Sequence, residues 1–133
     1  AGLASWDELE SGAIANAAAV GATLAAELEA RLAPFGIVGD VRCRGLLAGI
    51  EIVDGPDSNE PAGRQAAAIV YRCFELGLIT IYVGAPGNVI ELTPPLTITA
   101  DQARTGARII ERAVAEVEAG AFDEAKLAAF PGW

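Results

Sequence analysis

The sequence predicts an α+β fold: a small, mostly antiparallel sheet with helices packed on one face. The hydrophobic periodicities along the 133 residues run helix, strand, strand, helix, strand, strand, helix. All but one of the gaps between successive strand runs are too short for the helical crossover that a parallel pair needs. A chain of this length with 53% hydrophobic side chains supports one core. We therefore expect a single two-layer domain spanning residues 1–133.

Residues 6–32 predict one long amphipathic helix, because apolar side chains recur at steps of three and four from Ile14 to Leu32. Gly21 lies in this apolar stripe. Since glycine inside a helix costs about 1 kcal/mol relative to alanine, we expect another element to approach closely there. A Pro-Phe-Gly sequence at residues 34–36 ends the helix.

Two extended runs follow, at residues 37–42 and 46–53. In the second run the even-numbered positions, from Leu46 to Ile52, form the apolar face that should meet the core. Residues 54–61, DGPDSNEP, are dense in turn-forming residues and predict an exposed loop.

Residues 62–76 predict the next helix, with Pro61 suited to its first turn and Gly77 suited to the left-handed position after it. Residues 78–83, LITIYV, read as a strand that follows at once.

Thr99 and Gln102 have the spacing of a capping box and open a helix that Gly120 ends. A short helix is expected at residues 123–129. The aromatic residues of the final segment, residues 130–133, should then dock on the body or on a neighbour.

The stretch from Gly84 to Thr99, GAPGNVIELTPPLTIT, organises the second half of the chain. A glycine-rich loop leads into a short β-branched run, and Pro94-Pro95 ends it, because proline cannot continue a ladder. Glu91 is the last outward side chain of this strand, so we expect it to contact a ligand or partner. The structural alternative is a strand-end glutamate that faces water, beside a double proline that is only a stop.

The balance of charges excludes several functions. Nine basic and 18 acidic residues give a formal charge of −9, which argues against binding to nucleic acid or to an anionic membrane. No apolar run approaches the length of a membrane span. Because the sequence shows no secretory leader, its two thiols, Cys43 and Cys73, favour a reducing cytoplasm, although a disulfide between them stays open.

Groups that could carry catalysis are scarce in this sequence. Histidine is absent and Lys126, in a polar C-terminal stretch, is the single lysine. We expect Lys126 to be a solvated surface residue. Accordingly, we expect no catalytic, cofactor-binding or metal-ligating residue in this chain.

Three segments together resemble one enzyme family. They are DVRCRGLLAGIEIV at residues 40–53, LGL at residues 76–78 and GNVIELTPPLTIT at residues 87–99. In this order they resemble the C-terminal small domain of class III pyridoxal-phosphate-dependent aminotransferases, a group that includes ornithine, 4-aminobutyrate and ω-amino-acid aminotransferases. The helix at residues 16–32 extends the likeness upstream.

The resemblance implies the small domain of a fold-type I enzyme, the last portion of a longer homodimeric aminotransferase. Such an enzyme moves an amino group between an amine or amino acid and a 2-oxo acid. The Schiff-base lysine and most cofactor contacts would lie in the absent large domain. The 133-residue chain should then bind no pyridoxal phosphate, be inactive alone, and serve to close and shape the substrate pocket.

Two positions depart from the family pattern. Glu91 stands where family members commonly carry an arginine that grips a substrate carboxylate. Either the substrate presents an amine or hydroxyl there, or an arginine of the absent domain pairs with Glu91. Cys43 stands where glycine is usual, so it would be strained if that position needs a positive φ; otherwise it is a buried, inert thiol. For Arg42 and Arg44 we prefer ordinary ion pairs.

A hypothesis from a different functional class, a binding module instead of an enzyme domain, also remains. A short acidic α+β domain without catalytic side chains also fits a free-standing module that binds metabolites or dimerises.

Overall fold

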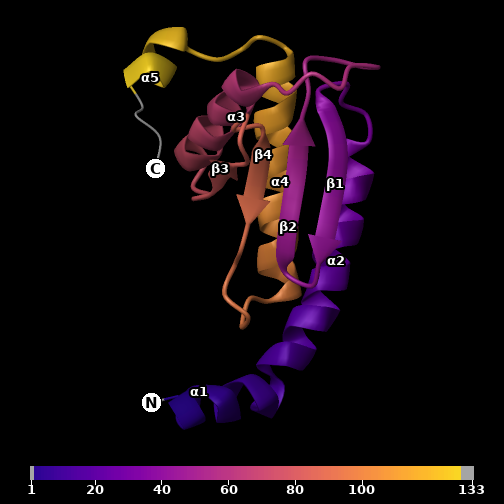
Figure 1. Ribbon diagram of the computed structural model, residues 1–133, viewed down its shortest axis with the longest axis vertical. Coiled ribbons are helices and arrows are strands. Elements are labelled where there is room, and N and C mark those ends of the chain that lie inside the picture. Colours follow the sequence, from indigo (N-terminus) through magenta and orange to yellow (C-terminus); the bar gives the residue numbers. More distant parts are fainter. Residues whose placement is uncertain (1, 130–133) are drawn as a thin grey trace.

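The computed structural model describes residues 2–129 (Figure 1). The helices and strands are α1 (Gly2–Glu8), η1 (Leu9–Ala13), α2 (Ile14–Leu32), β1 (Val38–Arg44), β2 (Leu47–Ile52), α3 (Gly63–Glu75), β3 (Ile81–Val83), β4 (Val89–Leu92), α4 (Ala100–Glu118) and α5 (Glu124–Ala129).

The four strands form one antiparallel sheet in the order β1-β2-β4-β3. Helix α3 carries the chain from β2 to the far edge of the sheet, and β4 then returns between β2 and β3. Figure 1 shows α2 and α4 behind the sheet. The predicted α+β arrangement, a small antiparallel sheet with helices on one face, is confirmed.

The core lies between the sheet and the helices. On β2 the even-numbered side chains are buried, as the alternation of the sequence predicts, and Ile50 and Ile52 are fully inaccessible. On β4 the equivalent positions are Ile90 and Leu92, which are also buried. The loop from residue 54 to residue 61 is largely exposed, in agreement with its turn-rich sequence.

Gly21 of α2 has the packing role expected for it. A Cβ atom at this position would lie 2.3 Å from the carbonyl carbon of Gly45, in the turn between β1 and β2. Only a residue without a side chain lets the helix backbone approach the turn so closely. Gly45 itself has a φ of 58°, which is the left-handed conformation that glycine adopts without strain.

The N-terminal helix differs from its prediction. One continuous helix was expected from residue 6 to residue 32, but the helix begins earlier and is broken by the π-helical segment η1. Gly12 has a φ of 147° inside this segment, which no regular helix accommodates. Helix α1 buries none of its residues, and it leaves the body at an angle in Figure 1.

The strand expected at residues 78–83 is shorter than predicted and spans only Ile81–Val83. Its first residues are held by the end of α3, because the Leu78 N–H donates to the Cys73 carbonyl at 2.9 Å. Gly77 has a φ of 90° and ends α3 as expected. Pro61, predicted in the first turn of α3, instead precedes the N-cap and forms a single β-bridge with Val53.

Helix α4 starts with the predicted capping box. The Gln102 N–H donates to the Thr99 hydroxyl, and the Thr99 N–H donates to the side chain of Gln102. Gly120, with a φ of 70°, follows its end.

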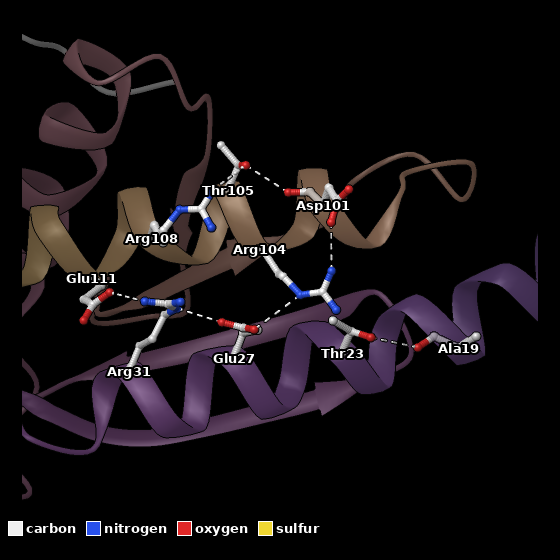
Figure 2. Close-up of polar contacts among 9 residues, drawn as sticks. All are labelled: Ala19, Thr23, Glu27, Arg31, Asp101, Arg104, Thr105, Arg108 and Glu111. Atoms are coloured by element: carbon white, nitrogen blue, oxygen red, sulfur yellow. Dashed lines mark hydrogen bonds and ion pairs between the residues drawn. The ribbon is translucent and has the colours of Figure 1, made fainter.

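Ion pairs join α2 to α4 along their outer surface (Figure 2). Arg31 donates to Glu27 at 2.8 Å on its own helix and to Glu111 of α4 at 2.6 Å. Arg104 of α4 lies 3.5 Å from the carboxylate of Glu27 and 2.9 Å from that of Asp101. Two of the helices that cover the sheet are therefore connected by charge as well as by their apolar faces.

The short C-terminal helix is present as α5, close to the predicted residues 123–129. The expected docking of the aromatic residues at 130–133 lies outside the described residues. Among residues 2–129, no helix combines the length and apolar character that crossing a membrane requires.

Candidate functional site

The second face of the sheet is not covered by any helix of residues 2–129, and we call it the open face. Strand registry places one row across it, in which Arg42 of β1 pairs with Gly49 of β2, Gly49 with Glu91 of β4, and Glu91 with Ile81 of β3. Because side chains alternate along a strand, the residues two positions away lie on the same face. They are Asp40, Arg44, Leu47, Glu51, Val83 and Val89.

Glu91 occupies the centre of this face. Its neighbours Ile90 and Leu92 point into the core, so its own side chain points outward and is half-buried, as the sequence predicts. The Thr80 hydroxyl donates to the Glu91 carbonyl at 2.6 Å and connects the β4 backbone to the residue that precedes the edge strand β3. Within residues 2–129, the Glu91 carboxylate has no hydrogen-bond or ion-pair partner. An acceptor is therefore left available at this position.

Two hollows meet at Glu91. One, of about 450 Å³, is mostly apolar and lies between the β3–β4 edge and α4, where Ile79, Ile81 and Pro94 line it. The other, of about 300 Å³, lies over the open face and includes Gly49 and Arg44. Volumes of this size are typical of small-molecule sites, and a single carboxylate in an apolar wall can orient a ligand through an ammonium or hydroxyl group. The sequence did not reveal the first hollow, because its walls come from distant segments.

The two arginines of β1 differ in their partners. Arg42 donates to Asp40 at 2.8 Å and to Glu51 at 2.6 Å, the ordinary ion pairs expected from the sequence. Hydrogen bonds to these carboxylates, with Glu51 the stronger influence, raise the pKa of Arg42. Arg44 does not follow the expectation, because within residues 2–129 it has no ion pair. Arg44 lies two residues farther along β1, opposite Leu47. It is therefore farther than Arg42 from Asp40 and Glu51, the two carboxylates with which Arg42 pairs.

The two cysteines are free thiols, so the disulfide left open by the sequence is not formed. Cys73 is fully buried, and burial raises its pKa to about 12. Cys43 is half-buried on the core side of β1, and burial, with a smaller effect of Glu29, raises its pKa. The strain considered for Cys43 is absent, because the positive φ of this turn falls on Gly45. Burial disfavours the thiolate form of both groups, so neither thiol has the environment of an activated nucleophile.

Lys126 lies on α5, and its side chain is about half exposed. Its ammonium donates to Glu75 of α3 at 3.0 Å, and this hydrogen bond raises the pKa of Lys126. A Schiff-base lysine needs the opposite environment, in which desolvation or neighbouring cations favour the neutral amine. Lys126 is therefore not suited to that role. Among the described residues, no group of three or more potential metal ligands comes together.

Helices stacked on one face of a four-stranded antiparallel sheet define an α+β domain that solved transaminases share. One structure, from a study of transaminases by ancestral reconstruction, matches 89% of this chain and 26% of its own, with 31% identity and a TM-score of 0.82. A Bacillus anthracis aminotransferase matches 86% of this chain and 27% of its own, with 29% identity and a TM-score of 0.80.

The sequence profile described as Aminotransferase class-III matches residues 2–114, and the chain belongs to this family. Alanine/serine racemase of Pyrococcus horikoshii is 40% identical over 111 residues, which cover 84% of this chain and 23% of that protein. The 4-aminobutyrate aminotransferase of Escherichia coli is 38% identical over 89 residues, which cover 67% of this chain and 19% of that protein. The chain thus spans about a quarter of the length of the relatives it matches.

Class III aminotransferases depend on pyridoxal phosphate, and one similar solved structure is an amine transaminase in its cofactor-bound form. Residues 2–129 do not fit the covalent attachment of this cofactor, because their single lysine is exposed and paired with Glu75.

Proposed function

We propose that this chain is the C-terminal small domain of a pyridoxal-phosphate-dependent class III aminotransferase. The observation that carries the proposal is the family match over residues 2–114, made by a chain that spans only about a quarter of its relatives. The full-length enzyme would transfer an amino group between an amine or amino acid and a 2-oxo acid. An open sheet face with an unpaired carboxylate supports this reading over a free-standing module.

In this proposal the chemistry is divided between two parts of the polypeptide. The large domain supplies the lysine and most contacts to pyridoxal phosphate, which stabilises carbanions by acting as an electron sink. The present chain closes and shapes the substrate pocket, and it excludes water there. The full-length enzyme is proposed to be a cytoplasmic homodimer, consistent with the acidic surface and the two reduced thiols.

Glu91 is the residue proposed to contact the substrate. Its carboxylate accepts hydrogen bonds and repels another carboxylate, so it favours a substrate with an amine or hydroxyl at this position. The alternative is an arginine of the large domain that pairs with Glu91. One measurement distinguishes contact with the substrate from pairing with an arginine. Only contact with the substrate makes the preference of the enzyme between amines and dicarboxylates depend on the side chain at residue 91.

The test uses the full-length protein with pyridoxal phosphate. Amino donors with a neutral, cationic or carboxylate end group are offered with pyruvate or 2-oxoglutarate, and the amino acid formed is measured. We expect Glu91→Arg to raise kcat/KM for carboxylate-bearing substrates at least tenfold relative to amines. Glu91→Gln should reduce the preference of the unmodified enzyme for amines over carboxylate-bearing substrates. Asp57→Asn, in the exposed loop, is the matched control and should change neither. Absence of amino transfer with every pair would contradict the proposed function.

A second candidate is racemisation or epimerisation of an amino acid. It is favoured by two relatives named as racemases: the Pyrococcus horikoshii enzyme and the leucine/methionine racemase of Thermococcus litoralis, which is 37% identical over 99 residues. One experiment separates the two activities. A single amino-acid enantiomer is incubated without any 2-oxo acid, and the opposite enantiomer is sought by chiral chromatography. Its appearance would favour racemisation, and its absence together with amino transfer would favour the first proposal.

A further inference from the structure

One end of the molecule gathers apolar side chains that the described residues do not cover. We call it the hairpin end and define it by Ile14, Arg44, Leu47 and Leu96. These residues come from the start of α2, the β1–β2 turn and the β4–α4 loop, which lie together at the lower end of Figure 1. Ile14 is 56% exposed, Leu47 52% and Leu96 37%. All four residues line one open hollow of about 400 Å³.

The backbone beneath these side chains is held in place. Asn16 of α2 donates from its side-chain nitrogen to the Leu96 carbonyl at 2.7 Å and to the Ile98 carbonyl at 3.0 Å. The β1–β2 turn is held against the same helix by the contact of Gly21 with Gly45. The three apolar side chains are therefore presented by a fixed framework rather than by a loose loop. Fixed apolar side chains that face solvent mark an interaction surface.

Arg44 adds a charge requirement to this surface. It has no ion pair within residues 2–129, although the chain as a whole carries an excess of acidic residues. The lining of the hollow contains no acidic residue. A partner that covers the hairpin end must therefore bring its own carboxylate, because burying an unpaired guanidinium is costly.

A second copy of this chain that used its own hairpin end for the contact would not meet this requirement. A two-fold interface places the same patch on both sides, so two hairpin ends would bring two arginines together without a carboxylate. About three quarters of the length of each of these relatives, in contrast, lies outside the part that this chain matches. The surface of that additional polypeptide does not have to repeat the residues of the hairpin end, so it can supply the carboxylate that Arg44 requires.

We propose that the hairpin end is the surface on which the rest of the full-length polypeptide packs, through an apolar segment that carries an aspartate or glutamate opposite Arg44. This inference rests on the proposed function, because it needs a longer enzyme. The domain contact would then be made by the β1–β2 turn and the β4–α4 loop, the two segments that flank the end of β4 beside Glu91. Docking and the position of the candidate substrate contact are thereby coupled.

The test is hydroxyl-radical footprinting of the full-length protein, with oxidation read at single residues by mass spectrometry. Relative to intrinsic side-chain reactivity, we expect Ile14, Leu47 and Leu96 to be oxidised at least fivefold more slowly than their exposure in the isolated domain implies. Phe74, 47% exposed on α3, is the internal reference and should keep its rate. Oxidation of the three residues at the rate of Phe74 would overturn the proposal. Protection that disappears on dilution would also overturn it, because it would identify a second copy as the partner.

A charge reversal tests the carboxylate. In the full-length protein, Arg44→Glu should raise the oxidation of Leu47 and Leu96 severalfold, while Arg44→Lys should not. Arg108→Glu makes the same charge change on α4, where, among residues 2–129, the side chain donates to Thr105, and it should leave the footprint unchanged. An equal response to both reversals would overturn the specific role of Arg44. Amino-transfer activity is measured separately, so a protected but inactive enzyme would contradict the proposed function and leave the docking inference intact.

Discussion

The two faces of the same four strands have opposite characters. Toward the helices, Ile50, Ile52 and Ile90 are completely inaccessible. Toward the other side, the same strands present Leu47 to solvent and place Glu91 with no partner among residues 2–129. The face toward the helices is therefore fully packed within residues 2–129, whereas the open face leaves an apolar side chain exposed and a carboxylate unpaired. Under the proposed function, the open face is the side of the sheet on which contacts with substrate or with the rest of the enzyme remain to be made.

The largest expected effect is a contrast between adjacent residues of β4. Ile90→Ala removes a fully buried side chain and should lower the free energy of unfolding by about 2–5 kcal/mol, through lost burial and the cavity left behind. Val89→Ala, one residue away on the open face, should cost about 1 kcal/mol or less. Urea denaturation of the 133-residue chain measures both. Equal losses would show that the open face is packed as tightly as the core.

Two glycines of the covering helices should respond to alanine with opposite signs. Gly21→Ala places a Cβ against the backbone of Gly45 and should destabilise by about 1–3 kcal/mol. Gly106→Ala, on α4, meets nothing within 4 Å and should stabilise by about 0.5–1 kcal/mol through helix propensity. Thermal unfolding followed by circular dichroism compares the two. A stabilising Gly21→Ala would show that the helix does not rest on the β1–β2 turn.

A smaller effect is expected at the start of α4, which covers the inner face. Thr99→Ala removes half of the capping box and should cost about 1 kcal/mol. Thr97→Ala, at an exposed position of the same loop, should stay within about 0.5 kcal/mol of the parent. Differential scanning calorimetry resolves the pair. A cost at Thr97 as large as that at Thr99 would assign the effect to the loop and not to the cap.

The smallest expected effect is the pH dependence of stability that arises from the ion pairs of Glu75 on α3 and Glu116 on α4. Hydrogen bonds from Lys126 and Arg72 lower the pKa of Glu75, and those from Arg72 and Arg112 lower the pKa of Glu116. A carboxylate whose pKa is lower in the folded state stabilises the fold above its unfolded pKa. That contribution is lost as the pH falls through the folded value.

Stability should therefore be flat near neutral pH and decrease below the ordinary pKa range of glutamate. The double variant Glu75→Gln, Glu116→Gln should show a shallower decrease. These pairs are partly exposed, so their contribution is modest and should shrink in 1 M salt. An identical acid profile for the variant and the parent would contradict this account.

The sequence predicts those features that depend on local chemistry or on strict alternation. The capping box at Thr99 follows from spacing, and the buried face of β2 follows from a period of two. Gly21 was predicted to face a close neighbour because glycine inside a helix needs a reason. The turn at Gly45 that supplies this reason could not be named, since it lies in another element.

The errors arise where the backbone departs from the element that the pattern of side chains predicts. Leu78 begins a segment whose side chains are typical of a strand, but its N–H donates to the Cys73 carbonyl at the end of α3. Gly12 breaks a helix whose apolar spacing is nearly continuous. Arg44 is chemically equivalent to Arg42 in the sequence, and only the register of the sheet decides which arginine reaches Glu51.

The strand order β1-β2-β4-β3 has a consequence for how the chain reaches its native state. β1 and β2 join through a short turn, so their pairing closes a small loop. β4 instead pairs with β2 between Glu51 and Val89 and between Ala48 and Leu92, across the whole of α3 and β3. Since closing a longer loop costs more chain entropy, we expect the central seam of the sheet to form after the hairpin and to limit the folding rate.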